Sequence, residues 1–186
     1  YFFVRRQLRQ QFPLLPVDLM RIPIFSVSIG TSICSFTGQM LSMLSLPFFL
    51  QETLKRSDVT TGLLLTPWPI ATMIIAPLAG RLVERIHAGI LGSIGMTIFA
   101  IGLFLLAVLP SNPTNMDIIW RLFICGSGFG LFQAPNNSTI ISSAPSNRSG
   151  GASGMLGTAR LLGQTLGATQ VAMIFYLVPI NSSQTC

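Results

Sequence analysis

One short segment of this 186-residue chain has the residue types of a nucleophilic site. Residues 151–154 read Gly-Ala-Ser-Gly, a pattern that could hold the serine nucleophile of a protease working inside a membrane. Such a serine needs a histidine to take its proton. The single histidine, His87, falls in a polar connection between two apolar runs, away from Ser153. We therefore expect that the protein is not an enzyme.

A glycine-rich segment and the cysteines are the other candidates for binding chemistry. Residues 126–130 read Gly-Ser-Gly-Phe-Gly, but this segment lies inside an apolar run with no preceding strand, so a phosphate-binding loop is not expected. Cys34 and Cys125 lie in separate apolar runs and Cys186 is the last residue, which gives neither a metal-ligand spacing nor a disulfide framework. The sequence therefore predicts no cofactor and no metal.

Arg160 is the strongest functional candidate, because it stands inside the last apolar run. An arginine about 10 residues into a membrane span is costly unless it is paired, hydrated or able to reach the interface. Two interpretations stay open: a charge in a functional cavity, or a side chain that snorkels to the cytoplasmic interface. The apolar runs contain no Asp or Glu, so a proton-coupling carboxylate is not expected in this segment.

Five apolar runs hold these residues, and each is long enough for a transmembrane helix. A helix needs about 20 residues to cross about 30 Å of hydrocarbon. Hydrophobic residues make up 50% of the chain and charged residues 9%, against about 25% charged residues in a typical soluble domain. We therefore expect an all-α integral membrane protein with the lipid bilayer as a partner. The predicted spans are residues 24–50, 61–80, 89–109, 118–142 and 151–178.

The placement of basic residues predicts the orientation. The net charge is +6, but the basic residues gather in the connections between spans, so a nucleic-acid partner is not expected. Cytoplasmic loops retain an excess of Lys and Arg, and the bias is seven against three, which makes the N-terminal side cytoplasmic. Residues 1–23 are interpreted as the end of an earlier helix plus a cytoplasmic connection, and residues 179–186 as a short polar tail. The seven are Arg5, Arg6, Arg9, Arg21, Arg81, Arg85 and Arg148, and the three are Lys55, Arg56 and Arg121.

Small and polar residues recur on one face of three predicted helices. The stripes are Thr31, Ser35, Gly38, Ser42 and Ser45; Gly126, Gly130, Gln133 and Asn137; and Ser153, Gly157, Arg160 and Gln164. An unpaired polar group costs several kcal/mol in hydrocarbon, so the stripes should face one another or a wet cavity. Interhelical hydrogen bonding without a cavity is the alternative. The candidate cavity residues are Ser35, Phe36, Met40, Met43, Gln133, Asn137, Arg160 and Gln164.

Proline and glycine predict where the helices depart from straight, isolated rods. Pro67, Pro69 and Pro77 remove backbone donors from the second span, so we expect a kink there. Glycine pairs with the GxxxG spacing occur at 126 and 130, at 150 and 154, and at 163 and 167. Small residues one turn apart allow close helix packing, which is the simplest interpretation of each pair.

The connection between the second and third spans resembles a family signature. Residues 80–87, Gly-Arg-Leu-Val-Glu-Arg-Ile-His, resemble the cytoplasmic loop of the major facilitator superfamily, which runs Gly, x, Leu, x, acid, Arg, x, Gly and then basic residues. His87 stands where the family prefers Gly, and Ala88 and Gly89 stand where it prefers basic residues. The resemblance implies that the acid and arginine latch neighbouring helices, so the loop has a conformational role. Its signature residues are Gly80, Leu82, Glu84 and Arg85.

Longer stretches are similar to one branch of that family. The segments LLPVDLMRIPIFS, LPFFLQ, LLLTPWP and SAPSNRSGGASGMLGTARLLGQTLG together resemble the 14-helix drug:proton antiporters of the EmrB/QacA type. On that template the spans are helices nine to thirteen, in the C-terminal half, and the partner is the missing N-terminal half with its proton-coupling acid. The resemblance implies a fragment of a multi-pass protein of the bacterial inner membrane. It also implies export of small amphipathic, often cationic substrates in exchange for protons. The alternative is a non-transporting membrane interaction or assembly subunit.

Overall fold

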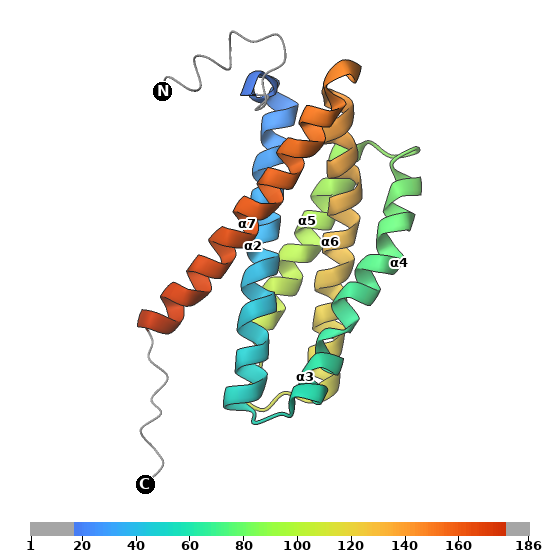
Figure 1. Ribbon diagram of the computed structural model, residues 1–186. Coiled ribbons are helices and arrows are strands. Elements are labelled where there is room, and N and C mark those ends of the chain that lie inside the picture. The colour runs from blue at the N-terminus through green and yellow to red at the C-terminus, as the bar shows by residue number, and fades with distance from the viewer. Residues whose placement is uncertain (1–16, 178–186) are drawn as a thin grey trace.

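The computed structural model describes residues 17–177, and the regular elements in this range are helical. They are η1 (Val17–Arg21), α2 (Pro23–Phe48), η2 (Phe49–Thr53), α3 (Asp58–Leu65), α4 (Pro67–Leu82), α5 (Ala88–Ala107), α6 (Asn115–Ser143), η3 (Ser146–Arg148) and α7 (Ser149–Leu177). Figure 1 shows the long helices side by side, with α7 crossing α2 obliquely. The all-α fold is confirmed. The interpretations of residues 1–16 and 178–186 lie outside the described residues.

Each predicted span corresponds to one helix or to two consecutive helices. Helix α2 continues directly into the π-helix η2, and α3 is followed by α4. Three helical stretches of the described range are long and apolar enough to cross a membrane, namely Pro23–Thr53, Asp58–Leu82 and Ala88–Ala107. Helices α6 and α7 have 29 residues each, but glycine and polar side chains replace many apolar ones. Glycine and polar side chains are typical of helices that pack against other helices, so this composition agrees with one face of α6 and of α7 being directed at neighbouring helices.

The second span bends where proline was expected to disturb it. Helix α3 ends at Leu65 and α4 begins at Pro67, which has no N–H for the preceding turn. The hydroxyl of Thr66 donates to the carbonyl of Gly62 at 2.9 Å, so the broken turn is partly repaired by a side chain. Figure 1 shows the resulting change of direction between α3 and α4.

Side-chain caps fix where two helices begin. The Ser57 hydroxyl accepts the N–H of Thr60 at 3.3 Å at the start of α3. At α6, the Thr114 hydroxyl accepts the N–H of Asp117 at 3.2 Å, and the Asp117 carboxylate accepts the N–H of Thr114 at 3.1 Å. This reciprocal pair of hydrogen bonds satisfies two backbone N–H groups that have no acceptor within the helix. Hydrogen bonds from Thr114, with a smaller attraction to Arg121, hold the pKa of the Asp117 carboxyl below its usual value.

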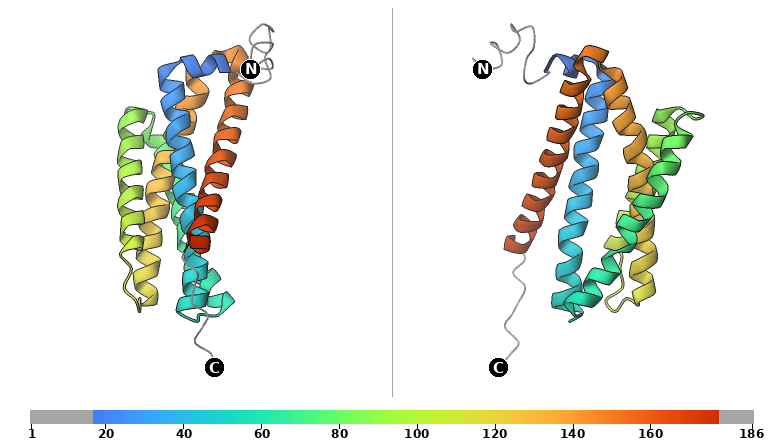
Figure 2. Two further views of the ribbon diagram at one scale, coloured as in Figure 1. Left: turned by 90° about the vertical axis from the view of Figure 1, so that its left-hand side faces the viewer. Right: turned by 45° about the vertical axis from the view of Figure 1, so that its right-hand side comes forward.

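Helix α6 packs on α4 and α5 through glycines, in the arrangement of Figure 2. A Cβ atom at Gly130 would lie 3.2 Å from the Cα of Thr72 on α4, and Gly126 is packed still closer to the same helix. On the other side, a Cβ atom at Gly95 of α5 would lie 2.5 Å from the backbone nitrogen of Phe132. The glycine pair at 126 and 130 therefore does bring two helix backbones into contact.

Helix α7 packs on α2 in the same way. A Cβ atom at either Gly163 or Gly167 would lie 2.6 Å from a carbonyl oxygen of α2. The hydroxyl of Thr37 donates across this contact to the carbonyl of Gly163 at 3.1 Å. A Cβ atom at Gly150 or Gly154 would have nothing within 4 Å, so the third glycine pair does not pack within the described residues.

The helices thus form two groups, one of α4, α5 and α6 and one of α2 and α7, which meet along α2 and α6. The Asn136 amide of α6 donates to the Ser32 hydroxyl at 2.7 Å and to the Ser28 carbonyl at 3.2 Å, both on α2. Further along the same contact, the rings of Phe36 and Phe129 meet edge to face with centroids 5.6 Å apart. This junction fixes the position of the two groups relative to each other.

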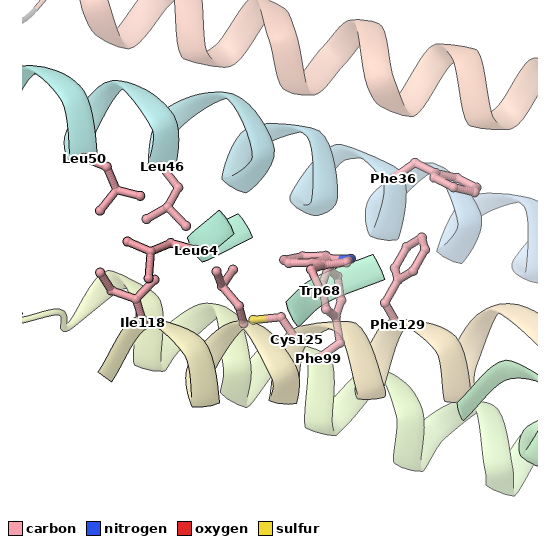
Figure 3. Packing of buried hydrophobic residues seen from close by; sticks show 10 residues of the cluster. Phe36, Leu46, Leu50, Leu64, Trp68, Phe99, Ile118, Cys125 and Phe129 are labelled. Carbon is pink, nitrogen blue, oxygen red and sulfur yellow. The ribbon is translucent and has the colours of Figure 1, made fainter. Parts of the chain in front are cut away.

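An apolar cluster fills the space between α2, α3, α4, α5 and α6. Trp68 is 2% exposed and meets Phe99 edge to face with ring centroids 5.8 Å apart. Figure 3 shows these side chains within the cluster. In a membrane such packing is stabilised mainly by van der Waals contact, because lipid tails are as apolar as the side chains. The cluster consists of Phe36, Leu46, Leu50, Leu64, Trp68, Phe99, Ile118, Leu122, Cys125 and Phe129.

The basic residues of the connections lie at the two ends of the bundle as the span order requires. In chain order, α2, α4, α5, α6 and α7 run alternately down and up in Figure 1. Among the described connections the bias is four basic residues against three, with Arg21, Arg81, Arg85 and Arg148 at one end and Lys55, Arg56 and Arg121 toward the other. Arg5, Arg6 and Arg9 supply the rest of the predicted bias and lie outside the described residues.

Candidate functional site

A cavity of about 320 Å³ lies between α2, α4, α6 and α7. It borders the junction between the two helix groups and is adjacent to the apolar cluster. Its volume is at the lower end of the range for small-molecule pockets, about 300–1,000 Å³. The wall consists of Phe36, Gln39 and Met43 of α2; Trp68, Pro69, Thr72 and Met73 of α4; Phe129 and Gln133 of α6; and Arg160 of α7.

Arg160 brings a positive charge to this cavity. It is the twelfth residue of α7, so its backbone lies about 16 Å along the helix, about half the thickness of a hydrocarbon core. Its guanidinium carbon lies 5.5 Å from the ring centroid of Phe36. A cation over an aromatic face at an exposed site gains about 0.5–1 kcal/mol. In this conformation the side chain turns toward α2 and does not extend to the beginning of α7.

No described carboxylate neutralises that charge. The ion pair formed within the described residues joins Lys55 and Glu52 at 3.9 Å, at the far end of α2. The wall of the cavity contributes amides from Gln39 and Gln133 and no acid. Because Arg160 is exposed within the described residues, its donors are available to a ligand or to another part of the protein.

Trp68 adds a buried donor to the same wall. The residue is 2% exposed, and its indole Nε1 is enclosed and has no hydrogen-bond partner among residues 17–177. A buried donor without an acceptor costs about 1–3 kcal/mol. In Figure 3 the indole nitrogen lies at the end of the ring system directed toward Phe129, whose centroid is 6.3 Å from that of Trp68. Trp68 thus contributes its ring to the cavity wall, while its unsatisfied N–H is covered by neighbouring side chains.

The structure brings together four of the residues predicted from sequence to share a cavity. These are Phe36, Met43, Gln133 and Arg160. Four others lie outside its wall. Ser35 is buried and donates to the carbonyl of Ser32 at 2.9 Å, and Met40 packs against α7 beside Gly167. Asn137 and Gln164 are half-buried and do not border the cavity.

The three polar stripes do not meet at one place. The first stripe faces α5: Gly38, Ser42 and Ser45 border a hollow of about 450 Å³ between α2 and α5. Thr31 borders another hollow, of about 750 Å³, near the N-terminal end of α2. Only Arg160 of the third stripe reaches the cavity. The expectation that the stripes line a common space therefore does not describe this arrangement, because α2 directs its small face at a different neighbour.

Three residues near the site were not selected from the sequence. Trp68 lies between two of the prolines that predict the kink, and Gln39 is a single amide within an apolar run, which is itself a signal in the sequence. Asn136 makes the buried hydrogen bonds between α6 and α2. The periodicity placed its neighbour Asn137, and not Asn136, on the polar face of the fourth span. Sequence periodicity places residues on a face, but the partner of that face comes from the tertiary structure.

The residues of the loop signature lie together at one end of the bundle. Gly80 and Leu82 end α4, and Glu84 and Arg85 lie in the turn that leads to α5. All of them are exposed, and neither charged side chain forms an ion pair within the described part of the chain. Their position at a helix connection agrees with the predicted location, and the latching role stays a prediction.

Comparison with known proteins places the chain in a family. The model of the Major Facilitator Superfamily matches residues 4–168. The chain is 66% identical over 173 residues to the uncharacterized transporter YebQ of Escherichia coli, covering 93% of this chain and 38% of YebQ. It is 31% identical over 166 residues to the multidrug resistance protein Stp of Mycobacterium tuberculosis, covering 89% and 30%.

The relatives are much longer than this chain. The multidrug efflux pump LfrA of Mycolicibacterium smegmatis is 30% identical over 173 residues, which are 93% of this chain and 34% of LfrA. The chain therefore spans about a third of the length of the relatives it matches. Since the family model covers most of its residues, this chain belongs to the Major Facilitator Superfamily.

Proposed function

We propose that this chain is part of a secondary active transporter that exports small amphipathic compounds in exchange for protons. The relatives named for multidrug resistance or efflux, at about 30% identity, support an export function. The four sequence segments noted above favour the 14-helix antiporter branch and a place in its C-terminal half. The remaining parts of the transporter, including a proton-coupling acid, would then be supplied by the rest of the protein.

The cavity that holds Arg160 is the observation that carries this proposal. Four helices contribute residues to its wall, which combines aromatic rings, methionines and amides with one charge. Methionine and aromatic side chains adapt to ligands of varied shape. A fixed positive charge also changes the energy of any charged ligand or proton-carrying acid that approaches it. These are the properties that an export site for amphipathic compounds requires.

The mechanism proposed is rocking of two halves about a midplane site. The bend between α3 and α4 lies beside the cavity, since Trp68 follows Pro67 directly. Glu84 and Arg85 would latch helices at the cytoplasmic end, together with Gly80 and Leu82. The N-terminal end of α2 would be cytoplasmic, and the protein would reside in a bacterial inner membrane.

Transport by the full-length protein tests the proposal. Reconstituted into vesicles with an imposed pH gradient, it should accumulate a fluorescent amphipathic dye, and an uncoupler should abolish the accumulation. Arg160→Gln should lower the rate at least about tenfold or shift its pH dependence. A tenfold lower rate corresponds to a loss of about 1.4 kcal/mol of stabilisation of the transition state. Arg160→Lys should retain part of the activity, because the charge survives without the planar fork.

Two controls define the result. Gln164→Ala changes a polar residue one turn further along α7 that does not border the cavity, so it should leave transport unchanged. Vesicles that contain the 186-residue chain alone should show no uptake. If the full-length protein inserts normally and moves no dye under any gradient, the transporter proposal is wrong and a non-transporting membrane subunit replaces it.

A further inference from the structure

We propose that the cavity between α2, α4, α6 and α7 selects aromatic ligands that carry a carboxylate. Arg160 and Trp68 would be the donors that recognise this group. The inference rests on the proposed function only in taking this cavity as the ligand site. It differs from the family resemblance, which implies substrates that are often cationic.

Arg160 is the first element of this selectivity. Its guanidinium lies over the ring of Phe36 at 5.5 Å and has no described carboxylate partner. The planar guanidinium presents paired N–H donors that match the geometry of a carboxylate, and such charge-assisted hydrogen bonds are stronger than neutral ones. The contact with Phe36 favours a position of the guanidinium beside the cavity, where a carboxylate would meet it.

Trp68 is the second, independent element. Its indole N–H is buried and unpaired, although buried polar groups are nearly always hydrogen-bonded. An indole N–H can only donate, so the group that satisfies it must be an acceptor. Trp68 and Arg160 line the same cavity from different helices, α4 and α7. Arg160 is exposed there, whereas the Trp68 N–H is covered by neighbouring side chains, so a ligand carboxylate would reach Arg160 first and the indole N–H only where those side chains yield.

The rest of the wall defines the body of the ligand. The rings of Phe36 and Phe129, packed edge to face 5.6 Å apart, form an aromatic part of the wall. Met43 and Met73 provide adaptable apolar contact. A volume of about 320 Å³ suits a small fused ring system rather than an extended molecule.

A cationic ligand of the same shape would be a poor occupant. It would approach the guanidinium with like charge and would leave the Trp68 donor unpaired. The amides of Gln39 and Gln133 offer acceptor oxygens, but these are neutral and are also donors. The wall described here thus discriminates by the sign of the ligand charge.

Three probes with one ring system test the inference on the purified full-length transporter in detergent. They are naphthalene-2-carboxylate, naphthalene-2-carboxamide and 2-naphthylmethylammonium, titrated by calorimetry at pH 7. The carboxylate should bind at least tenfold more tightly than the ammonium probe. Arg160→Gln should weaken carboxylate binding at least tenfold and change carboxamide binding less than twofold. Trp68→Phe, which keeps an aromatic ring, should weaken the carboxylate and the carboxamide severalfold and leave the ammonium probe unchanged.

Controls separate ligand contact from damage to the fold. Gln164→Ala should leave all three affinities unchanged, and each variant should elute and unfold as the parent does. If Arg160→Gln folds normally and binds the carboxylate as the parent does, the inference is overturned, and an acid from another part of the protein would be the partner of Arg160. Tighter binding of the ammonium probe than of the carboxylate by the parent would overturn it as well.

The transport assay distinguishes this inference from the proposed function. Gradient-driven dye uptake without a preference for the carboxylate would overturn the ligand class and leave the transporter proposal intact. Carboxylate binding that depends on Arg160, without any gradient-driven uptake, would support the ligand site and contradict the transporter proposal.

Discussion

Replacing Gly163 by alanine should loosen the contact between α2 and α7 that positions Arg160. A Cβ atom there would lie 2.6 Å from the carbonyl oxygen of Ile33 and 2.8 Å from the Cβ of Phe36. Ordinary contacts begin at 3.4 Å, so α7 must move by nearly 1 Å or accept the clash. Overpacking of this kind costs about 1–3 kcal/mol. The backbone atoms of α2 cannot yield as a flexible side chain would.

A matched variant on the same helix removes the contribution of helix propensity. Alanine is favoured over glycine in a helix by about 1 kcal/mol, and this gain applies equally to Gly154→Ala. A Cβ atom at Gly154 has nothing within 4 Å. The difference in stability between the two variants therefore isolates the clash, and we expect Gly163→Ala to be the less stable by about 1–3 kcal/mol.

Thermal unfolding of the purified full-length protein in detergent measures this difference. Gly163→Ala should unfold at a temperature several degrees below that of Gly154→Ala. It should also weaken any ligand contact that depends on the guanidinium over Phe36, because Gly163 lies three residues after Arg160. Equal unfolding temperatures for the two variants would refute the proposed close contact between the helix backbones.

Two further predictions concern the junction and the orientation. Asn136→Ala should destabilise the protein by about 1–3 kcal/mol, since it removes two buried hydrogen bonds between α6 and α2, whereas Asn137→Ala should cost about 0.5 kcal/mol or less by the same unfolding assay. In a background lacking Cys34, Cys125 and Cys186, a cysteine replacing Ser57 should react with an impermeant maleimide on intact cells and one replacing Ser146 should not. Equal losses in the first experiment, or reversed labelling in the second, would contradict these predictions.

The helices could be predicted because a bilayer leaves few choices. Long apolar runs must satisfy their backbone hydrogen bonds internally, so they become helices. Proline at position 67 predicts the bend for the same reason, since a missing N–H cannot be replaced within the helix. The glycine pairs at 126 and 130 and at 163 and 167 likewise lie where helices touch. These properties depend on residues that are near one another in the sequence.

The site was less predictable because it depends on which helices are neighbours. The periodicity of α2 correctly groups Ser35, Gly38 and Ser42 on one face, yet that face meets α5 rather than the cavity. Asn136 and Asn137 differ by only 100° around α6, and a sequence without its tertiary partners cannot say which one meets α2. Trp68 could be placed in the bent segment, but its buried, unpaired N–H is visible only when α4, α6 and α2 are packed together.

The glycine contacts and the chemistry of the cavity are consequences of the same packing. Because Gly163 and Gly167 allow α7 to approach the backbone of α2, Arg160 comes close enough to lie over Phe36. Because Gly126 and Gly130 allow α4 to approach α6, Trp68 reaches the rings of Phe99 and Phe129. One pair of helices thus brings Arg160 to the cavity, and the other brings the ring of Trp68 to its wall. The four glycines thus position the side chains of the site without contacting a ligand. Enlarging one of them should shift Arg160 or Trp68, while the same residues continue to line the cavity.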